Sequence, residues 1–549
     1  MKETKKSEFI LQLAAKYPFG VAMTGTLLLL LSFPPIDWWP LAWVALIPWL
    51  SLISVKKFEA PKPFRSIWFA GLIYWALQAY YISIPHPALW IAWTMLFSYL
   101  SVYPVLFVWI SRKMVHGQCV SLMFAAPVVF TAMEWVRAHM LTGFGFCMLA
   151  NSQYRVPLSL QFCDIAGAYG LTLMMVIFTS ALFLAVISQT GKWKYVLNAL
   201  VSLGIVLGYG QFRLSTIPTN GDSLDIAVMQ GSIDTRFPST RAEQEADDKQ
   251  RFTEYQLLQK DWLRDNDWPV PDLIVWPEGK YPIPHLMPGG GQEEQEVRQA
   301  FRRYYGLLFD EMLALKNWQE TPQLPEMIVG CGTFDPVNDD RYNSALLVRN
   351  GQVFETYHKI HLVPFGEFIP FGEWLPFLKR ATPIGAGYAA GSQDVAFPVK
   401  DKIGCVSICF ESVVAHRVRE SIAYLKANDS EPDFLLNVTD DGWFYGHALL
   451  DHHLACNVVR AVENRKPLIV AANTGISAFI DARGIILQEG PRRERKVLRM
   501  DVPLPGVRSF YALLGDWPAI AFTIMCILAI IYPANNKYQQ FQRNPIKEG

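Results

Sequence analysis

The chain has no surplus of charge of either sign. Its 549 residues include 49 Lys and Arg against 49 Asp and Glu, so the formal net charge is zero. This balance leaves no overall electrostatic footprint for nucleic acid or for an acidic partner. The sequence also contains no internal repeat, no low-complexity run and no Cys-x-x-Cys pair. Function therefore has to be read from local groups of residues.

Apolar residues, in contrast, are abundant. They make up 51% of the chain, and the mean hydropathy is +0.17. This content of apolar side chains is larger than one soluble core needs. The excess is concentrated at the two ends of the chain, in runs of about 20 residues, the length that crosses a bilayer. Eight runs are predicted to span a membrane: 18–34, 40–55, 66–84, 88–111, 120–141, 168–188, 194–213 and 513–533. A signal peptide accounts for one such run only.

Basic residues in the short connections predict the orientation of these spans. Lys and Arg occur before the first span, after the second, fourth and sixth spans, and in the tail, whereas connections 32–39 and 83–87 contain none. By the positive-inside rule, both termini are cytoplasmic and the long segment lies outside the cytoplasm. The predicted domains are 1–213 with seven spans, 214–510 outside the cytoplasm, and 511–549 with the last span and a cytoplasmic tail.

The external segment has the pattern of an α/β domain. Short β-rich runs alternate with charged helical stretches, which predicts a layered fold with helices covering the faces of a sheet. The predicted strands are 225–230, 272–277, 327–333, 344–349, 353–357, 403–409, 433–438 and 468–472. The predicted helices include 293–316, 412–426 and 447–463.

Three of these strands end in reactive side chains. The run 272–277 leads into Glu278, the run 353–357 leads into Lys359, and the run 403–409 ends on Cys409. In open α/β sheets the carboxyl ends of strands line the ligand crevice. The three side chains are therefore expected to converge, although they are far apart in the sequence.

Cys409 has four interpretations. A disulfide with Cys405 does not fit an extended strand, since four residues span about 13 Å and a disulfide needs roughly 4.4–6.8 Å between Cα atoms; Cys331 and Cys456 stay open as partners. A metal site would use His447, Asp451, His452 and His453, but adjacent residues on a helix point about 100° apart, which disfavours zinc. Inert packing is common for a buried cysteine.

The fourth interpretation is a nucleophile. Ser412 resembles the N-cap of a helix that follows Cys409 directly. A helix N-terminus and a nearby lysine both favour the thiolate, so a lowered pKa of Cys409 is expected.

Several motifs resemble the Glu-Lys-Cys motifs of the nitrilase superfamily. They are WPEG at 276–279, YHKIHLVPFGEFIPFG at 357–372 and GCVSICFES at 404–412. With the multi-span amino-terminal region and the single carboxy-terminal span, they are similar to the apolipoprotein N-acyltransferases. VMQGSI at 228–233, DDGWF at 440–444, RAVENRKPLIVAANTGIS at 460–477 and EWVRAHMLTGFGF at 134–146 extend the resemblance over nearly the whole chain.

The resemblance implies a polytopic helical membrane domain joined to a four-layer α-β-β-α sandwich, with a catalytic triad. Glu278 would be the general base, Lys359 would stabilise the oxyanion, Cys409 would be the nucleophile and Glu367 would support them.

Further positions are assigned to substrate binding by the same resemblance. Phe410 and Glu411 adjoin the nucleophile, and Trp443 follows the acidic pair. Arg137 is expected to contact a phosphate or polar headgroup, and Phe146 stands where the family often has tryptophan. For Arg137 and its neighbour Glu134, pairing between helices is the alternative, because charges at membrane depth are costly unless paired or wet.

The expected reaction moves a fatty acyl chain from a phospholipid, through a cysteine thioester, to the N-terminal amine of the diacylglyceryl-cysteine of an apolipoprotein. The chemistry fits the residues, because a thiolate attacks esters and a fixed cation stabilises the tetrahedral state. No metal or cofactor and no nucleic acid is expected, and the partners are the bilayer, the donor lipid and the acceptor lipoprotein. The expected state is a monomer in the bacterial inner membrane with a periplasmic catalytic domain.

Some positions depart from the family pattern. Ser232 and Asp440 stand where asparagine is usual, and Lys280 and Tyr281 stand where small or apolar residues are usual. None of them removes a catalytic group. Aromatic and aliphatic residues that crowd 365–378 either close the edge of the sheet or enter the membrane interface as a gate for acyl chains.

Three rival functions are considered. A membrane-tethered amidase would give the acyl group to water, and a related acyltransferase would give it to a different amine. A transporter with an inert external domain is disfavoured, because the spans show no matched pair of broken helices and few charges.

Overall fold

A computed structural model of the chain describes residues 2–87, 89–219, 221–235, 240–265, 270–287, 325–350, 352–370 and 387–533. The chain forms two compact units. Unit 1 contains Met1–Tyr80, Trp93–Leu214 and Leu513–Gly549, and unit 2 contains Tyr81–Ala92 and Ser215–Ala512.

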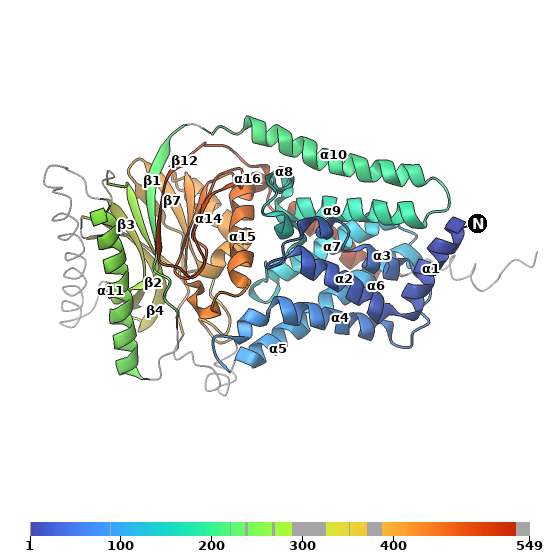
Figure 1. The fold of residues 1–549 in the computed structure, drawn as a ribbon, viewed down its shortest axis with the longest axis horizontal. Helices are drawn as coiled ribbons and strands as arrows, with labels where there is room; N and C mark the ends of the chain where they lie inside the picture. Colours follow the sequence, from blue (N-terminus) through green and yellow to red (C-terminus); the bar gives the residue numbers. More distant parts are fainter. Residues whose placement is uncertain are drawn as a thin grey trace, which may run out of the picture. The chain divides into compact units, whose positions relative to one another are not determined.

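Unit 1 is helical. Its longer helices are α1 (Lys2–Lys16), α2 (Pro18–Ser32), α3 (Ile47–Ser54), α4 (Pro63–Gln78), α5 (Leu89–Leu100), α6 (Val102–Arg112), α7 (Leu122–His139), α9 (Cys163–Ile187), α10 (Lys192–Thr216) and α17 (Trp517–Ile531) (Figure 1). Helices α2, α3, α4 and α17 each carry a proline in the first turn. Proline is tolerated there because the first N–H groups of a helix have no intrahelical partner.

Three described helical stretches are long and apolar enough to cross a membrane: Leu89–Gly117, Cys163–Ile187 and Lys192–Thr216. A bent pair, Ser7–Lys16 with Pro18–Ser32, would be a fourth, although its two helices meet at 105°. Shorter apolar helices occupy Trp39–Ser54 and Trp517–Ile531. The full set of eight spans therefore stays a prediction, since the predicted run 40–55, for example, contains only the 8-residue helix α3 beside a short 3-10 helix.

Unit 2 contains two six-stranded sheets. The first has the order β12-β1-β2-β3-β4-β5 and the second the order β11-β10-β9-β8-β7-β6. The first is built from β1 (Ser223–Gln230), β2 (Leu273–Leu286), β3 (Glu326–Asp335), β4 (Asp340–Arg349), β5 (Gln352–His358) and β12 (Lys496–Pro503). The second is built from β6 (Ala396–Val399), β7 (Lys402–Ile408), β8 (Phe434–Thr439), β9 (Leu468–Ala472), β10 (Ala478–Ile480) and β11 (Ile486–Glu489).

The two sheets share one apolar core. Alternate residues of both sheets, such as Ile226 and Val228 of β1 and Leu436 and Val438 of β8, belong to a single buried cluster. The other face of the first sheet packs against α11 (Arg241–Asp265), through residues such as Tyr255 and Trp276. Figure 1 shows α11 outside the first sheet, and α14 (Ala415–Ala427) and α15 (Leu449–Asn464) outside the second.

Strand direction explains where the site forms. In the second sheet β7, β8 and β9 run parallel, so the residues that follow them, Cys409, Asp440 and Asn473, lie at one edge. In the first sheet β3 and β5 are each antiparallel to β4, so they end at the same side. The eight predicted strands are confirmed, whereas β6, β10, β11, β12 and α11 were not predicted. The predicted helix 293–316 lies outside the described residues.

Candidate active site

Cys409 follows β7 directly and starts a short 3-10 turn, Cys409–Val413. Its backbone has a positive φ of 54°, which is uncommon for a residue with a side chain. The strained peptide is held through the Cys409 carbonyl oxygen, which accepts hydrogen bonds from Asn437 Nδ2 at 3.1 Å and from Ser412 Oγ at 3.3 Å. His453 Nε2 lies 3.2 Å from the same oxygen.

The expectation that Ser412 caps a helix at the cysteine is wrong. Helix α14 begins only at Ala415, with Val414 as its N-cap, because the 3-10 turn comes first and uses the Ser412 hydroxyl for the Cys409 carbonyl. The expected lowering of the thiol pKa is also wrong for this state. Burial raises the pKa of Cys409 well above its usual range and the charge of Glu278 adds to the rise, while Lys359 opposes it.

Lys359 lies immediately after β5 and is 1% exposed. Its Nζ donates to Glu367 Oε1 at 2.8 Å and lies 4.0 Å from Glu278 Oε1. Burial acts to lower the pKa of Lys359, but the charges of Glu367, Cys409 and Glu278 outweigh it and raise the pKa above its usual range. The ammonium group is therefore a fixed positive charge beside the thiol.

Glu278 lies within β2, where the pairing register with β3 shifts between Trp276 and Tyr281. Its Oε1 accepts from Asn343 Nδ2 at 2.7 Å and its Oε2 accepts from the Asp440 N–H at 2.8 Å. Gly330 of β3 makes room for this irregular strand, because a Cβ there would lie 2.5 Å from Glu278 Cα. Burial raises the pKa of Glu278, Lys359 opposes the rise and Glu367 adds to it.

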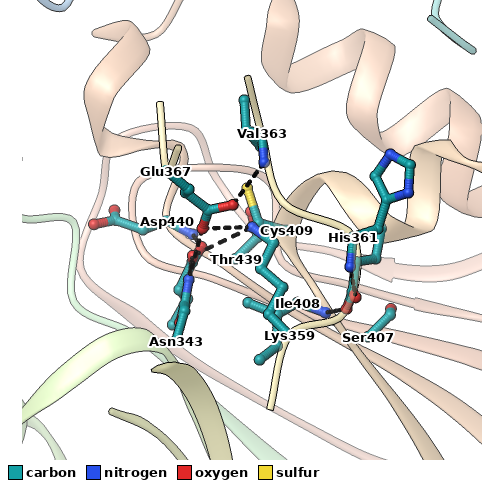
Figure 2. A network of polar contacts seen from close by, with 12 residues as sticks. Asn343, Lys359, His361, Val363, Glu367, Ser407, Ile408, Cys409, Thr439 and Asp440 are labelled. Carbon is teal, nitrogen blue, oxygen red and sulfur yellow. Dashed lines mark hydrogen bonds and ion pairs between the residues drawn. The ribbon is translucent and has the colours of Figure 1, made fainter. Parts of the chain in front are cut away.

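Glu367 and Asn343 complete the polar network (Figure 2). Glu367 Oε1 accepts from Asn343 Nδ2 at 2.9 Å as well as from Lys359, and its Oε2 accepts from the Val363 N–H at 2.9 Å. Asn343 thus links Glu278 to Glu367. Sequence reasoning missed Asn343, which lies in the polar first half of β4, where the sequence is DRYNS, just before the predicted strand 344–349.

Glu411 is 1% exposed, and its carboxylate accepts hydrogen bonds from four protein groups. Its Oε1 accepts from Tyr357 OH and from the N–H groups of Ile360 and His361, each at 2.9 Å, and its Oε2 accepts from the Ile408 N–H at 2.7 Å. The carboxylate therefore fastens the segment that carries Lys359 to the strand that carries Cys409.

The remaining predicted substrate contacts of unit 2 lie at partly exposed places. Phe410 is half-buried, with its ring 6.0 Å from that of His361. Trp443 is half-buried in the 3-10 turn Asp441–Phe444. Of the predicted gate, Phe365 and Phe368 are described and are joined by a backbone hydrogen bond of 2.7 Å from Phe365 N to Phe368 O, whereas 371–378 lies outside the described residues.

Arg137 and Phe146 lie in unit 1. Arg137 is 3% exposed, and its guanidinium donates to the carbonyl oxygens of Phe146 at 2.5 Å and Cys147 at 3.3 Å. It lies 3.9 Å from Glu134, whose carboxylate accepts from Leu149 N and Thr172 Oγ1, each at 2.7 Å. Both charged groups thus have partners within unit 1, and Arg137 as a headgroup contact stays a prediction.

The disulfide and metal interpretations find no support in the described part of the chain. No disulfide joins any of the eight cysteines there, and no group of three His, Cys, Asp or Glu residues in that part is placed to hold a metal ion. The histidines instead contact protein groups: His453 Nδ1 lies 3.2 Å from Asp441 Oδ1.

Two families match different parts of the chain. Residues 25–207 match the apolipoprotein N-acyltransferase N-terminal domain, and residues 271–512 match the carbon-nitrogen hydrolase family. A solved structure of Nit3 from Saccharomyces cerevisiae, a member of branch 10 of the nitrilase superfamily, is 14% identical and covers 54% of this chain and 95% of its own, with a TM-score of 0.36.

Curated relatives cover almost the whole chain. An apolipoprotein N-acyltransferase of Geobacter metallireducens is 32% identical over 522 residues, which is 91% of this chain and 93% of the relative. One from Rhodopirellula baltica is 27% identical over 536 residues, 89% of this chain and 92% of the relative. The chain therefore belongs to the apolipoprotein N-acyltransferase family.

Proposed function

We propose that the protein transfers a fatty acyl chain from a phospholipid to the N-terminal amine of the diacylglyceryl-cysteine of an apolipoprotein. The observation that carries this proposal is the buried group of Glu278, Lys359 and Glu367 around the thiol of Cys409, in a chain whose full-length relatives are apolipoprotein N-acyltransferases.

In the first half-reaction, Glu278 takes the proton of Cys409 and the sulfur attacks the ester carbonyl of the donor lipid. Lys359 holds the negative oxygen of the tetrahedral intermediate in a buried site, where a fixed charge is effective. The carbon–oxygen bond to the lipid then breaks. The leaving alkoxide takes the proton from Glu278 and departs as a lysophospholipid, which leaves a thioester on Cys409.

In the second half-reaction, the amine of the acceptor attacks the thioester carbonyl and Glu278 accepts a proton from the nitrogen. The carbon–sulfur bond breaks, the sulfur takes that proton back from Glu278, and the acyl group leaves as an amide. Two half-reactions through one covalent intermediate give ping-pong kinetics.

The proposal includes the finer structural expectations. Unit 2 would be the four-layer α-β-β-α sandwich of the superfamily, which the helices outside its two sheets support. The domains would be 1–213, 214–510 and 511–549. A monomer would lie in the inner membrane, with both termini cytoplasmic and unit 2 in the periplasm.

Intact-protein mass spectrometry tests the proposal. After incubation in mixed micelles of phosphatidylethanolamine and phosphatidylglycerol, the wild type should gain one acyl mass that hydroxylamine removes. Cys409→Ala should gain none. Cys405→Ala is the matched control, because Cys405 is buried in β7, the strand that precedes Cys409, and lies outside the polar network. This variant should be acylated like the wild type.

Two results would contradict the proposal: no acyl mass on the wild type, or a mass that persists in Cys409→Ala. The second half-reaction is followed by adding a diacylglyceryl-cysteine peptide. An amide product supports the transferase. Free fatty acid without amide identifies a tethered hydrolase, and acylation of other amines alone identifies a different acceptor.

A further inference from the structure

A buried ion pair lies beside the proposed general base. Lys280 Nζ is 2.7 Å from Asp440 Oδ2, and the two side chains are 0% and 8% exposed. Removing two charges from water is expensive, and losing one partner leaves the other charge uncompensated. Neither residue belongs to the proposed triad, so this costly pair calls for a physical role.

Asp440 joins several segments through its carboxylate. Its Oδ2 also accepts from Thr235 Oγ1 at 2.6 Å, and its Oδ1 accepts from the Gly442 N–H at 3.1 Å and from Asn473 Nδ2 at 2.8 Å. The segment after β1, the turn after β8 and the end of β9 therefore meet at this one side chain. The surroundings are tight, since a Cβ on Gly442 would lie 2.8 Å from Asp440 Oδ1.

The backbone of the same residue contacts the proposed base. The Asp440 N–H donates to Glu278 Oε2 at 2.8 Å, and Asn343 holds the other carboxylate oxygen. Lys280 is two residues beyond Glu278 in β2, so the ion pair ties the strand that carries the base to the peptide that orients it. Figure 2 shows Asp440 beside Glu367 and Asn343 in this network.

We propose that Lys280 and Asp440 are positioning residues, which hold the Glu278 carboxylate toward Cys409 and keep the charge next to it balanced. The inference rests on the proposed function, because it assigns Glu278 as the base. It deepens that function by adding a pair that acts through Glu278 and contacts no substrate atom.

Several charged or titratable groups face Glu278 or Lys280 from the surrounding elements. They are Lys359, Glu367, Asp440, Cys409 and Tyr388 around Glu278, and Asp440 and Arg251 around Lys280. The negative charge of Asp440 raises the pKa of Glu278, and the interaction of Lys280 with Glu278 has the opposite sign. The effects of the two residues on the base therefore oppose each other while both are charged.

This opposition gives a test that a purely structural role would not pass. Lys280→Met removes the positive charge and leaves Asp440 with its three other donors. The midpoint of the acidic limb of the Cys409 acylation rate should then move up by about one pH unit. In Lys280→Met/Asp440→Asn both charges are removed, while the backbone N–H of residue 440 that donates to Glu278 is kept. The midpoint should then return at least halfway to that of the wild type.

Rates are measured on folded, purified full-length protein by the gain of acyl mass in the same phosphatidylethanolamine and phosphatidylglycerol micelles. Arg349→Met is the control, because it breaks another ion pair of unit 2, with Glu326 at 2.8 Å, away from the base. It should leave the midpoint unchanged. The double variant also guards against misfolding, since it buries no unpaired charge.

A midpoint in Lys280→Met within about 0.3 pH unit of the wild type would overturn the inference. So would a double variant whose midpoint is no closer to the wild type than that of Lys280→Met. Both outcomes leave the proposed function intact, because the wild type still forms the thioester. Absence of the acyl mass in the wild type would instead overturn the proposed function itself.

Discussion

At the scale of single residues, the proton on Cys409 determines how the reaction can begin. Burial favours the neutral thiol, so the proposed nucleophile would form only when a base takes the proton. Glu278 has a raised pKa and Lys359 supplies a fixed positive charge that stabilises the thiolate once it forms. A site built in this way keeps the sulfur protonated until a base such as Glu278 accepts its proton.

The first prediction is therefore a pH dependence. With Glu278 as the proposed base, acylation would need its carboxylate ionised, and the pKa of Glu278 is raised from 4.5. The acylation rate should thus rise with pH through a midpoint above 4.5 and stay level afterwards, because the raised pKa of Lys359 keeps the ammonium charged. Initial rates of acyl-mass gain between about pH 5 and pH 9 measure this.

Glu278→Gln is the matched control for that profile, since it keeps the shape of the side chain and removes the base. It should lose at least 100-fold in rate, in line with the roughly 10²–10⁴-fold contribution of general bases. An unchanged acidic limb in this variant would show that another group accepts the proton.

Sequence patterns identify the residues of the proposed triad but not all of their hydrogen-bond partners. Glu278, Lys359 and Cys409 follow apolar strand patterns, and such positions converge at one edge of a sheet. Asn343 is different, because its two acceptors are 65 and 24 residues away along the chain. Lys280 and Asp440 are 160 residues apart, so their pairing also becomes visible only in the fold.

At the scale of elements, Glu411 connects the ends of two strands, and no pattern in the sequence predicts this connection. Its carboxylate accepts from the end of β7 and from the segment after β5. The same turn explains the misplaced helix start, since Glu411 and Ser412 use their side chains to close a 3-10 turn before α14. Serine is a common N-cap residue, but the Ser412 hydroxyl donates to the Cys409 carbonyl and does not cap α14.

The second prediction concerns this connection between the end of β7 and the segment after β5. Glu411→Gln places an amide N–H₂ where the carboxylate now receives buried donors, so at least one of them loses its acceptor. The free energy of unfolding should fall by about 1–3 kcal/mol. Acylation of Cys409 should slow by about tenfold, because Lys359 and Cys409 are no longer held in the same relative position. Chemical denaturation and the acyl-mass assay measure the two effects.

Glu420→Gln is the comparison variant, because Glu420 is on α14 and its side chain is 53% exposed. Neither stability nor acylation should change measurably there. If Glu411→Gln acylates as fast as Glu420→Gln, the carboxylate does not position the site.

At the scale of the whole molecule, exposed apolar side chains and charge distribution argue for a membrane protein with a defined orientation. On α10 the exposed large residues include Trp193, Leu197, Leu200 and Phe212, a surface suited to lipid. Basic residues follow alternate predicted spans, and by the positive-inside rule we expect Arg112 and Lys113 on the cytoplasmic side. The catalytic unit would then be on the opposite side of the membrane.

The third prediction tests this orientation with a cysteine that the chain already has. Cys119 is exposed and lies close to Lys113, so in a Cys409→Ala background a membrane-impermeant maleimide should not reach it in intact spheroplasts. A cysteine introduced by Glu420→Cys, on the surface of unit 2, should be labelled in the same cells. Permeabilised cells should label both sites. Labelling of Cys119 without permeabilisation, or protection of position 420, would reverse the orientation, because the positive-inside rule ties the two positions to opposite compartments.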